Sequence, residues 1–254
     1  MTEKEYCIQN EDKRLYGFLY LPDAGVRNGE EKLPLIISSH GFNGSYIRNR
    51  DYAERMTGLG FAFYCFDFYG GSLESLSGGS MTEMSVLTEA GDLEAVLRHF
   101  RQEDLFDSER IWLWGNSQGG YVSTYLAGKY PDWVRGLILL YPAYVIQDIV
   151  RDFASSFPAK SDSINHWDAR VGRIYVEDAM TVDIYAMMER FSGKVLIVHG
   201  DKDDMVPVRY SREAAKFFPD VRLHILQGAG HGFEGDYREK MKDLAEEFLQ
   251  ADNG

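Results

Sequence analysis

The segment Gly115-Asn116-Ser117-Gln118-Gly119-Gly120 directly follows the apolar run Ile111-Trp112-Leu113-Trp114. A buried strand that ends in Gly-x-Ser-x-Gly and turns at once into a helix is typical of a nucleophile elbow. The tight turn lifts the serine hydroxyl above the sheet, and the glycines keep side chains from colliding around it. Short Gly/Ser strings also arise by chance in glycine-rich loops. The segment therefore predicts a nucleophile at Ser117 provided that a histidine and an acid stand nearby.

Two later segments supply an acid and a histidine in loops that follow predicted strands. The apolar run Val195–Val198 is typical of a buried parallel strand, and the acidic loop from His199 to Pro207 follows it. The run 223–226 predicts another strand, and a glycine-rich loop containing His231 comes next. The order serine, aspartate, histidine along the chain is the one expected for an α/β-hydrolase.

The residues alone leave three acids open for the third position of such a triad: Asp201, Asp203 and Asp204. The acids that do not fill it are expected to be solvated or to accept hydrogen bonds from backbone N–H groups in the turn.

Of the six histidines, His231 is the expected base. The other five lie on a charged helix face, inside a strand, in the long segment before Lys194, or ahead of a glycine at a strand end (His99, His224, His166, His40 and His199). Since no histidine pair has the H-E-x-x-H type of spacing and the two cysteines are far apart, the sequence predicts no metal site.

Five motifs occur in order along nearly the whole chain: His40-Gly41-Phe42, Asp67-Phe68-Tyr69-Gly70-Gly71-Ser72, the elbow, Gly200-x-x-Asp203-x-x-Val206-Pro207 and Gly230-His231-Gly232. On these motifs the chain resembles α/β-hydrolases and, among them, the small bacterial cinnamoyl (feruloyl) esterases. Similar motifs recur in esterases, lipases, thioesterases and peptidases. The resemblance implies an α/β fold, with a mostly parallel central sheet, helices on both faces and a small inserted cap.

The resemblance also implies roles for individual residues. The family places its triad acid at the fourth position of Gly-x-x-Asp-x-x-Val-Pro, which is Asp203 here. One oxyanion-hole donor is the backbone N–H of the residue after the nucleophile, Gln118. By resemblance Phe42 supplies the second N–H, although its ring can also pack at the floor of the pocket. Trp167 and Tyr175 resemble cap residues that hold a phenolic ring, and are candidates for substrate binding.

The spacing of apolar residues predicts alternating strands and helices over residues 1–254, in one domain. One helical face is formed by Val86, Ala90, Leu93, Leu97 and Phe100, which recur at steps of four and three. About fifty residues separate the strand that ends near Leu140 from the next one, far more than a simple crossover needs. We expect residues 143–190 to form the cap. The alternative for its many aromatic and methionine side chains is that they pack the cap onto the body.

Composition excludes several classes of function. The net charge of −13 argues against nucleic-acid binding and an anionic membrane surface. No apolar run approaches the ~20 residues that a transmembrane helix needs, and residues 1–5 show no signal-peptide core. Cys7 and Cys65 do not make a disulfide framework. These features favour the cytoplasm. They leave the oligomeric state open, with a homodimer as one alternative.

Together these observations predict a serine carboxylic-ester hydrolase that works through a covalent acyl-enzyme, without a metal or organic cofactor, on a small-molecule ester of the aromatic (cinnamoyl or feruloyl) or short acyl type. The same triad would also serve a peptidase or amidase, a lipase or a thioesterase. A binding role without catalysis is disfavoured, because all the triad residue types are present.

Overall fold

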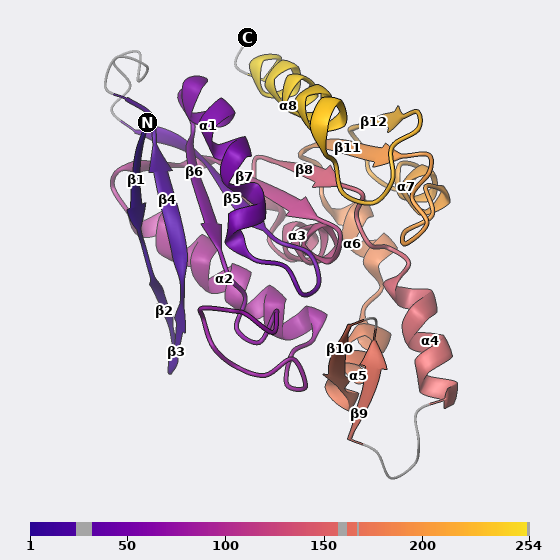
Figure 1. The fold of residues 1–254 in the computed structure, drawn as a ribbon. Coiled ribbons are helices and arrows are strands. Elements are labelled where there is room, and N and C mark those ends of the chain that lie inside the picture. Colours follow the sequence, from indigo (N-terminus) through magenta and orange to yellow (C-terminus); the bar gives the residue numbers. More distant parts are fainter. Residues whose placement is uncertain (24–31, 157–161, 167, 253–254) are drawn as a thin grey trace.

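An eight-stranded sheet forms the centre of the computed structural model, which describes residues 1–23, 32–156, 162–166 and 168–252 (Figure 1). Its strands are, in spatial order, β1 (Thr2–Glu5), β4 (Gly17–Leu21), β6 (Ala62–Phe66), β5 (Leu33–Ser39), β7 (Phe106–Asn116), β8 (Gly136–Leu140), β11 (Lys194–Gly200) and β12 (Val221–Leu226). The β1–β4 and β4–β6 pairs are antiparallel, and all the other neighbours are parallel. The mostly parallel sheet predicted from the sequence is confirmed.

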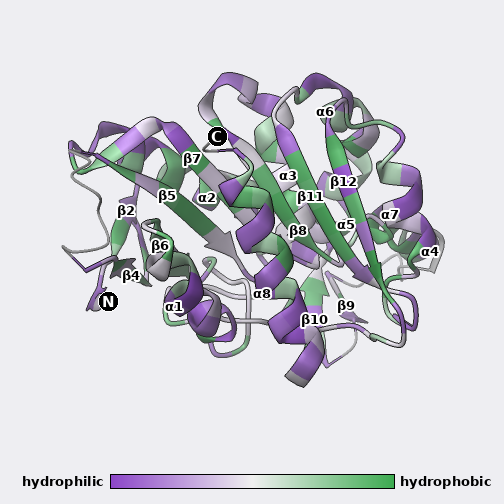
Figure 2. Ribbon diagram, turned by 90° about the horizontal axis from the view of Figure 1, so that it is seen from above, coloured by the Kyte–Doolittle hydropathy of each residue, from purple (hydrophilic) through white to green (hydrophobic). Residues whose placement is uncertain are grey.

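Helices cover both faces of this sheet. On one face lie α1 (Arg50–Gly58) and α8 (Gly235–Gln250), and on the other α2 (Val86–Gln102) and α3 (Gln118–Lys129) (Figure 1). The central strands β5, β8 and β11 are mainly hydrophobic (Figure 2), because both of their faces are buried. Each face therefore has its own apolar core, and the sheet lies between two helical layers.

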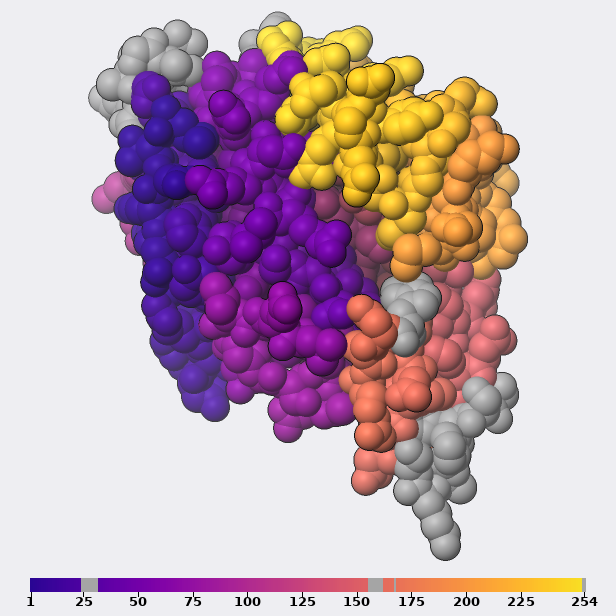
Figure 3. Space-filling view, viewed as in Figure 1, coloured from indigo at the N-terminus to yellow at the C-terminus, as the bar shows by residue number. Residues whose placement is uncertain are grey.

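The segment between β8 and β11, named here the cap segment (residues 143–190), contains five elements. They are α4 (Ile146–Ser156), β9 (Ser163–His166), β10 (Ala169–Gly172), α5 (Arg173–Thr181) and α6 (Ile184–Arg190). The strands β9 and β10 pair as an antiparallel hairpin, which the sequence did not predict. In Figure 3 the hairpin lies beside the surface of the chain that leads into α2. The contact is tight, because a Cβ at Gly172 would come within 1.9 Å of the Thr82 carbonyl oxygen.

The N-terminal strands depart from the expected pattern. The sequence predicts one strand over residues 15–21, but the structure has β3 (Lys13–Leu15), paired with β2 (Ile8–Asn10), and a separate β4 that begins at Gly17. Tyr16 separates them because its N–H donates to the Ser77 hydroxyl at 2.8 Å instead of to a neighbouring strand.

Three short helices complete the described structure: η1 (Tyr46–Asn49), η2 (Pro131–Trp133) and α7 (Arg209–Ala214). None of the helices in the described ranges combines the length and the apolar character needed to cross a bilayer.

Candidate active site

Ser117 lies in the sharp turn between β7 and α3. Its backbone has φ 51° and ψ −118°, a conformation that residues with a Cβ rarely adopt, and its N–H donates to the Leu140 carbonyl at 2.9 Å. The flanking glycines are required by space. A Cβ at Gly115 would lie 2.5 Å from the Gly119 carbonyl oxygen, and one at Gly119 would lie 2.3 Å from that of Ser39. The elbow therefore needs glycine at both positions.

The loops after β11 and β12 bring an acid and a histidine to this turn. The Nε2 atom of His231 lies 3.1 Å from the Ser117 Oγ atom, and its Nδ1 atom lies 2.7 Å from Oδ2 of Asp203. Because parallel strands end at the same edge of a sheet, residues distant in sequence meet there. The structure thus joins Ser117, His231 and Asp203 in one chain of hydrogen bonds, in the arrangement that lets a histidine remove the serine proton.

Asp203 is held by more hydrogen bonds than the histidine alone supplies. Its Oδ1 atom accepts from the backbone N–H groups of Met205 (3.0 Å) and Val206 (2.7 Å). Its Oδ2 atom also lies 3.1 Å from His199 Nε2. Burial raises the pKa of Asp203, but the hydrogen bonds from His199, His231 and Val206 together outweigh it and hold this pKa well below its usual range. The carboxylate therefore stays ionised beside His231.

The two other candidate acids lie elsewhere. Asp201 accepts from the Gly228 N–H at 2.6 Å, so it ties the loop after β11 to the loop after β12. Asp204 is exposed. Of the three acids left open by the residues alone, the structure brings only Asp203 into contact with His231.

The backbone around Ser117 offers donors for an oxyanion. Gln118 is the first residue of α3, and its N–H makes no hydrogen bond within the described part of the chain. The loop that contains Phe42 passes directly beside the serine, since a Cβ at Gly41 would lie 3.0 Å from the Ser117 Cβ. The Phe42 ring packs edge-on against His166, with 4.9 Å between the ring centroids. The position of Phe42 is therefore compatible with both roles expected for it, a backbone N–H donor to the oxyanion and a ring that packs at the floor of the pocket.

The two residues expected to bind substrate are placed differently. Trp167 lies outside the described residues. Tyr175 is only 1% exposed, and its hydroxyl donates to the Gln118 Oε1 atom at 2.8 Å. It is not among the residues that line the cavity at Ser117. In this structure the Tyr175 hydroxyl is thus used inside the protein, so the expected contact with a substrate finds no support.

A cavity of about 1040 Å³ reaches Ser117 and His231. It runs between the η1–α1 segment and the start of α8, and the cap segment contributes Asp168 to its lining. On one wall the Tyr141 ring packs against the His231 ring, with 4.6 Å between centroids. Residues of η1 and α1 that line it include Ile47, Arg48 and Asp51. The space is large enough for a small-molecule ligand.

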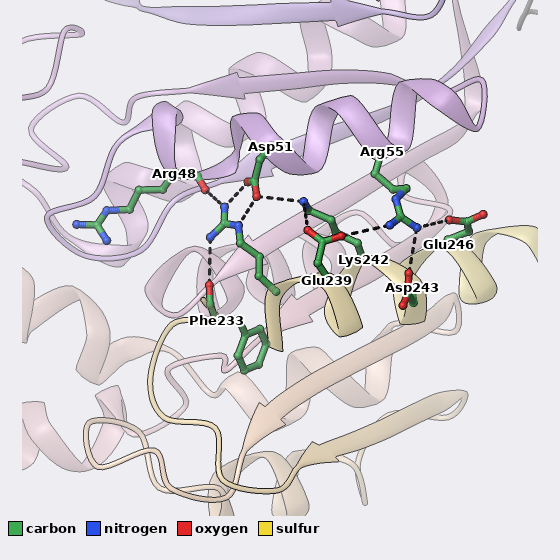
Figure 4. A network of polar contacts seen from close by, with 9 residues as sticks. Arg48, Asp51, Arg55, Phe233, Glu239, Lys242, Asp243 and Glu246 are labelled. Carbon is green, nitrogen blue, oxygen red and sulfur yellow. Dashed lines mark hydrogen bonds and ion pairs between the residues drawn. The ribbon is translucent and has the colours of Figure 1, made fainter. Parts of the chain in front are cut away.

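A network of charged residues fixes the outer wall of this cavity (Figure 4). Arg238 of α8 pairs with Asp51 of α1, donates to the Phe233 and Arg48 carbonyl oxygens, and lies 4.4 Å from the centre of the Tyr52 ring. Further along the same helices, Arg55 contacts three acids, Glu239, Asp243 and Glu246. These contacts hold α8, and with it the loop that carries His231, against α1.

Sequence reasoning missed several of these residues. The sequence places His199 ahead of a glycine at a strand end, and this position does not by itself predict its contact with Asp203. His199 lies near the end of β11 and Asp203 follows it four residues later, a spacing that could have suggested the contact. Arg238 and Asp51 are 187 residues apart, and no local pattern marks their pairing.

The chain is similar to known proteins in sequence and in fold. The model of the family described as serine aminopeptidase S33 matches residues 30–160, and the model described as the α/β-hydrolase fold matches residues 144–233. Among curated proteins, YitV of Bacillus subtilis (strain 168), whose name proposes an esterase, is 26% identical over 230 residues, covering 87% of each chain.

Solved structures extend the similarity to three dimensions. Est1E from Butyrivibrio proteoclasticus with bound ferulic acid has a TM-score of 0.85 and 26% identity, over 96% of this chain and 98% of that one. The DcsB complex with its substrate analogue has a TM-score of 0.77 and 19% identity, over 98% and 99% of the two chains, which supports the likeness of the fold alone.

Proposed function

Because this chain belongs to the α/β-hydrolases, in the family described as serine aminopeptidase S33, we propose that it is a serine carboxylic-ester hydrolase. The observation that carries the proposal is the hydrogen-bonded chain from Ser117 through His231 to Asp203 at 3.1 Å and 2.7 Å. His231 takes the serine proton while Ser117 Oγ attacks the ester carbonyl, and Asp203 stabilises the resulting imidazolium.

The oxyanion of the tetrahedral intermediate is proposed to be held by the N–H groups of Gln118 and Phe42. Losing one such donor typically costs about 3–4 kcal/mol of transition-state stabilisation. His231 then protonates the leaving alcohol, and an acyl group stays on Ser117. Water repeats the sequence and releases the acid. These steps place no metal or organic cofactor in the reaction.

For the substrate we propose a small ester with an aromatic, cinnamoyl or feruloyl acyl group, or with a short acyl group. The similarity to Est1E, whose structure holds ferulic acid, supports the aromatic group. The cavity of about 1040 Å³ is compatible with an acid of that size. We place the protein in the cytoplasm and treat residues 143–190 as a cap within a single domain, both as parts of the proposal.

A second candidate is hydrolysis of an amide, which the name of the matching family favours. The triad itself does not separate the two, because an ester and an amide pass through the same kind of tetrahedral intermediate. Peptidase activity therefore belongs in the same experiment.

The test measures turnover of p-nitrophenyl acetate, p-nitrophenyl octanoate, methyl ferulate and alanine p-nitroanilide by the wild type and by Ser117→Ala. Ser123→Ala is a matched control, because Ser123 is buried in the same helix and its hydroxyl has no partner in the described structure. We expect turnover of methyl ferulate that Ser117→Ala abolishes and Ser123→Ala retains. Hydrolysis of the anilide and of none of the esters would contradict the proposed esterase function and support a peptidase function instead. Activity that survives in Ser117→Ala would contradict the role of Ser117.

A further inference from the structure

A carboxyl group that is buried from solvent lies next to Gln118, the residue that follows Ser117. Glu89, in the first turns of α2, is 0% exposed. Its Oε2 atom accepts a hydrogen bond from Gln118 Nε2 at 2.9 Å, whereas its Oε1 atom has no hydrogen-bond partner in the described structure. An ionised carboxylate so deeply buried and half-satisfied is costly, so this environment favours the neutral acid.

Gln118 is held at both ends of its side-chain amide. The Nε2 atom donates to Glu89 of α2, and the Oε1 atom accepts from the Tyr175 hydroxyl of α5 at 2.8 Å. All three side chains are buried. Since the backbone N–H of Gln118 is the proposed oxyanion donor next to Ser117, these two hydrogen bonds restrict the residue that supplies it.

Among the described residues, the groups near Glu89 supply no positive charge, and they include His40, because a Cβ at Gly71 would lie close to both His40 Cε1 (3.1 Å) and Glu89 Oε1 (3.3 Å). On α2 itself, Asp92 adds a negative charge, which raises the pKa of Glu89. From the loop after β5, the His40 ring contacts the Gly41 carbonyl through Nδ1 (2.7 Å) and accepts from the Phe68 N–H at Nε2 (3.1 Å). That pattern fixes the neutral form of His40, because a protonated ring could not accept a hydrogen bond.

From the remaining two elements, α5 presents the Tyr175 hydroxyl and α3 presents the Gln118 amide, both uncharged. Burial raises the pKa of Tyr175 well above its usual range, so the phenol stays neutral. No cation pairs with Glu89 within the described ranges of the chain. Burial, which is the largest effect, raises the pKa of Glu89 to about 8, although the hydrogen bond from Gln118 lowers it.

We propose that Glu89 is a positioning residue that, as a neutral acid, fixes Gln118 beside Ser117, and that its ionisation lowers turnover. The proposal rests on the ester hydrolysis proposed above. When Glu89 loses its proton, a negative charge forms one side chain away from the site where the oxyanion develops. Two like charges repel strongly in a poorly solvated interior, so the intermediate becomes harder to reach.

Kinetics of three proteins test the positioning role: the wild type, Glu89→Gln and Glu89→Leu. Glutamine has the shape of the protonated acid and cannot ionise, whereas leucine offers Gln118 no acceptor. The measurement is kcat and KM for p-nitrophenyl acetate from about pH 6 to about pH 10.

We expect wild-type kcat to fall about tenfold or more between about pH 7 and about pH 10, with a midpoint near pH 8 and KM little changed. Glu89→Leu should lower kcat about tenfold or more at pH 7. Glu89→Gln should restore most of that loss and remove the alkaline fall. An alkaline fall with the same midpoint in Glu89→Gln as in the wild type would overturn the proposal, and so would a wild-type profile without any fall.

A second measurement does not depend on turnover. The infrared difference spectrum between the wild type and Glu89→Gln should contain the C=O stretch of a protonated carboxyl group at pH 7, and the band should disappear with a midpoint near pH 8. Absence of this band at pH 7 would overturn the proposal even in an active esterase. A band in a protein that hydrolyses none of the esters would instead contradict the proposed function, while the neutral state of Glu89 would stand.

Discussion

His199 Nε2 lies 3.1 Å from Oδ2 of Asp203, the same oxygen that accepts a hydrogen bond from His231. The same Nε2 atom is 2.8 Å from the Val206 carbonyl oxygen, and Nδ1 is 2.7 Å from the Ser211 hydroxyl. Because both neighbours of Nε2 are acceptors, this nitrogen carries the proton and donates to them. His199 thus orients the acid that orients His231.

Replacing His199 should therefore weaken catalysis although its ring is remote from Ser117. A hydrogen bond to a charged group contributes about 1.5–3 kcal/mol, so we expect His199→Leu to lower kcat by roughly 10- to 150-fold. His199→Gln keeps an N–H donor and should lose less. Ester turnover checks this, together with thermal melting to verify the fold. Wild-type kcat in a folded His199→Leu protein would show that Asp203 does not need this support.

The strained backbone of Ser117 predicts a gain in stability from glycine. Residues in sparsely populated backbone conformations cost about 1–3 kcal/mol, a cost that glycine largely avoids. We expect Ser117→Gly to unfold in urea with a free energy about 1 kcal/mol or more above that of Ser117→Ala. Both variants lack the hydroxyl and should be inactive, so the comparison isolates the backbone. Equal stabilities would mean that the turn is not strained.

The space around Gly119 predicts that even a methyl group there is not tolerated. A Cβ at this position would lie 2.3 Å from the Ser39 carbonyl oxygen and 2.4 Å from that of His40. We expect Gly119→Ala to lower the free energy of unfolding by several kcal/mol, on the order of 3 or more.

Gly91, which is exposed on α2, is the matched control for that variant. A Cβ there meets nothing within 4 Å, so Gly91→Ala should raise stability by about 0.5–1 kcal/mol. Urea unfolding of both variants checks the pair. A Gly119→Ala protein as stable as Gly91→Ala would contradict the close approach of these backbones.

Glu89 also predicts a dependence of stability on pH. The pKa of this group is about 8 in the folded protein and about 4.3 in the unfolded chain. The folded state therefore holds the proton more tightly, and its contribution to stability is present below about pH 4 and is lost as the pH rises towards 8.

Since glutamine does not titrate, the stability of Glu89→Gln relative to the wild type should increase by about 1.4 kcal/mol per pH unit across that window and then level off. Urea unfolding of both proteins at several pH values measures this slope. A difference that does not change between pH 5 and pH 8 would show that Glu89 titrates normally.

The parts of the site that depend on local chemistry could be predicted from the sequence. The sequence predicts the elbow from Gly115, Ser117 and Gly119, because the turn leaves no room for a Cβ atom at either glycine position. The apolar runs predict the strands, and the glycine-rich loop after one of them carries His231 towards Ser117. These features are short in sequence, and each carries its own physical reason.

What the sequence did not reveal depends on contacts between distant elements. A glutamate on an amphipathic helix is normally exposed, so nothing local marked Glu89 as buried. Tyr175 has the residue type of a ligand-binding side chain, yet its hydroxyl is satisfied by Gln118, which is 57 residues away. Likewise, the pairing of Asp51 with Arg238 exists only once α1 and α8 lie side by side.

The hydrogen bonds that join Glu89, Gln118 and Tyr175 also constrain how this protein can evolve. A mutation of Tyr175 to phenylalanine would leave the side-chain carbonyl oxygen of Gln118 without its donor. A mutation of Gln118 would leave both Glu89 and Tyr175 without their hydrogen-bond partner. Selection should therefore change these three positions together or not at all. The cavity wall formed by α1 and the start of α8 contains none of these three residues, so substitutions on that wall leave both hydrogen bonds of Gln118 in place.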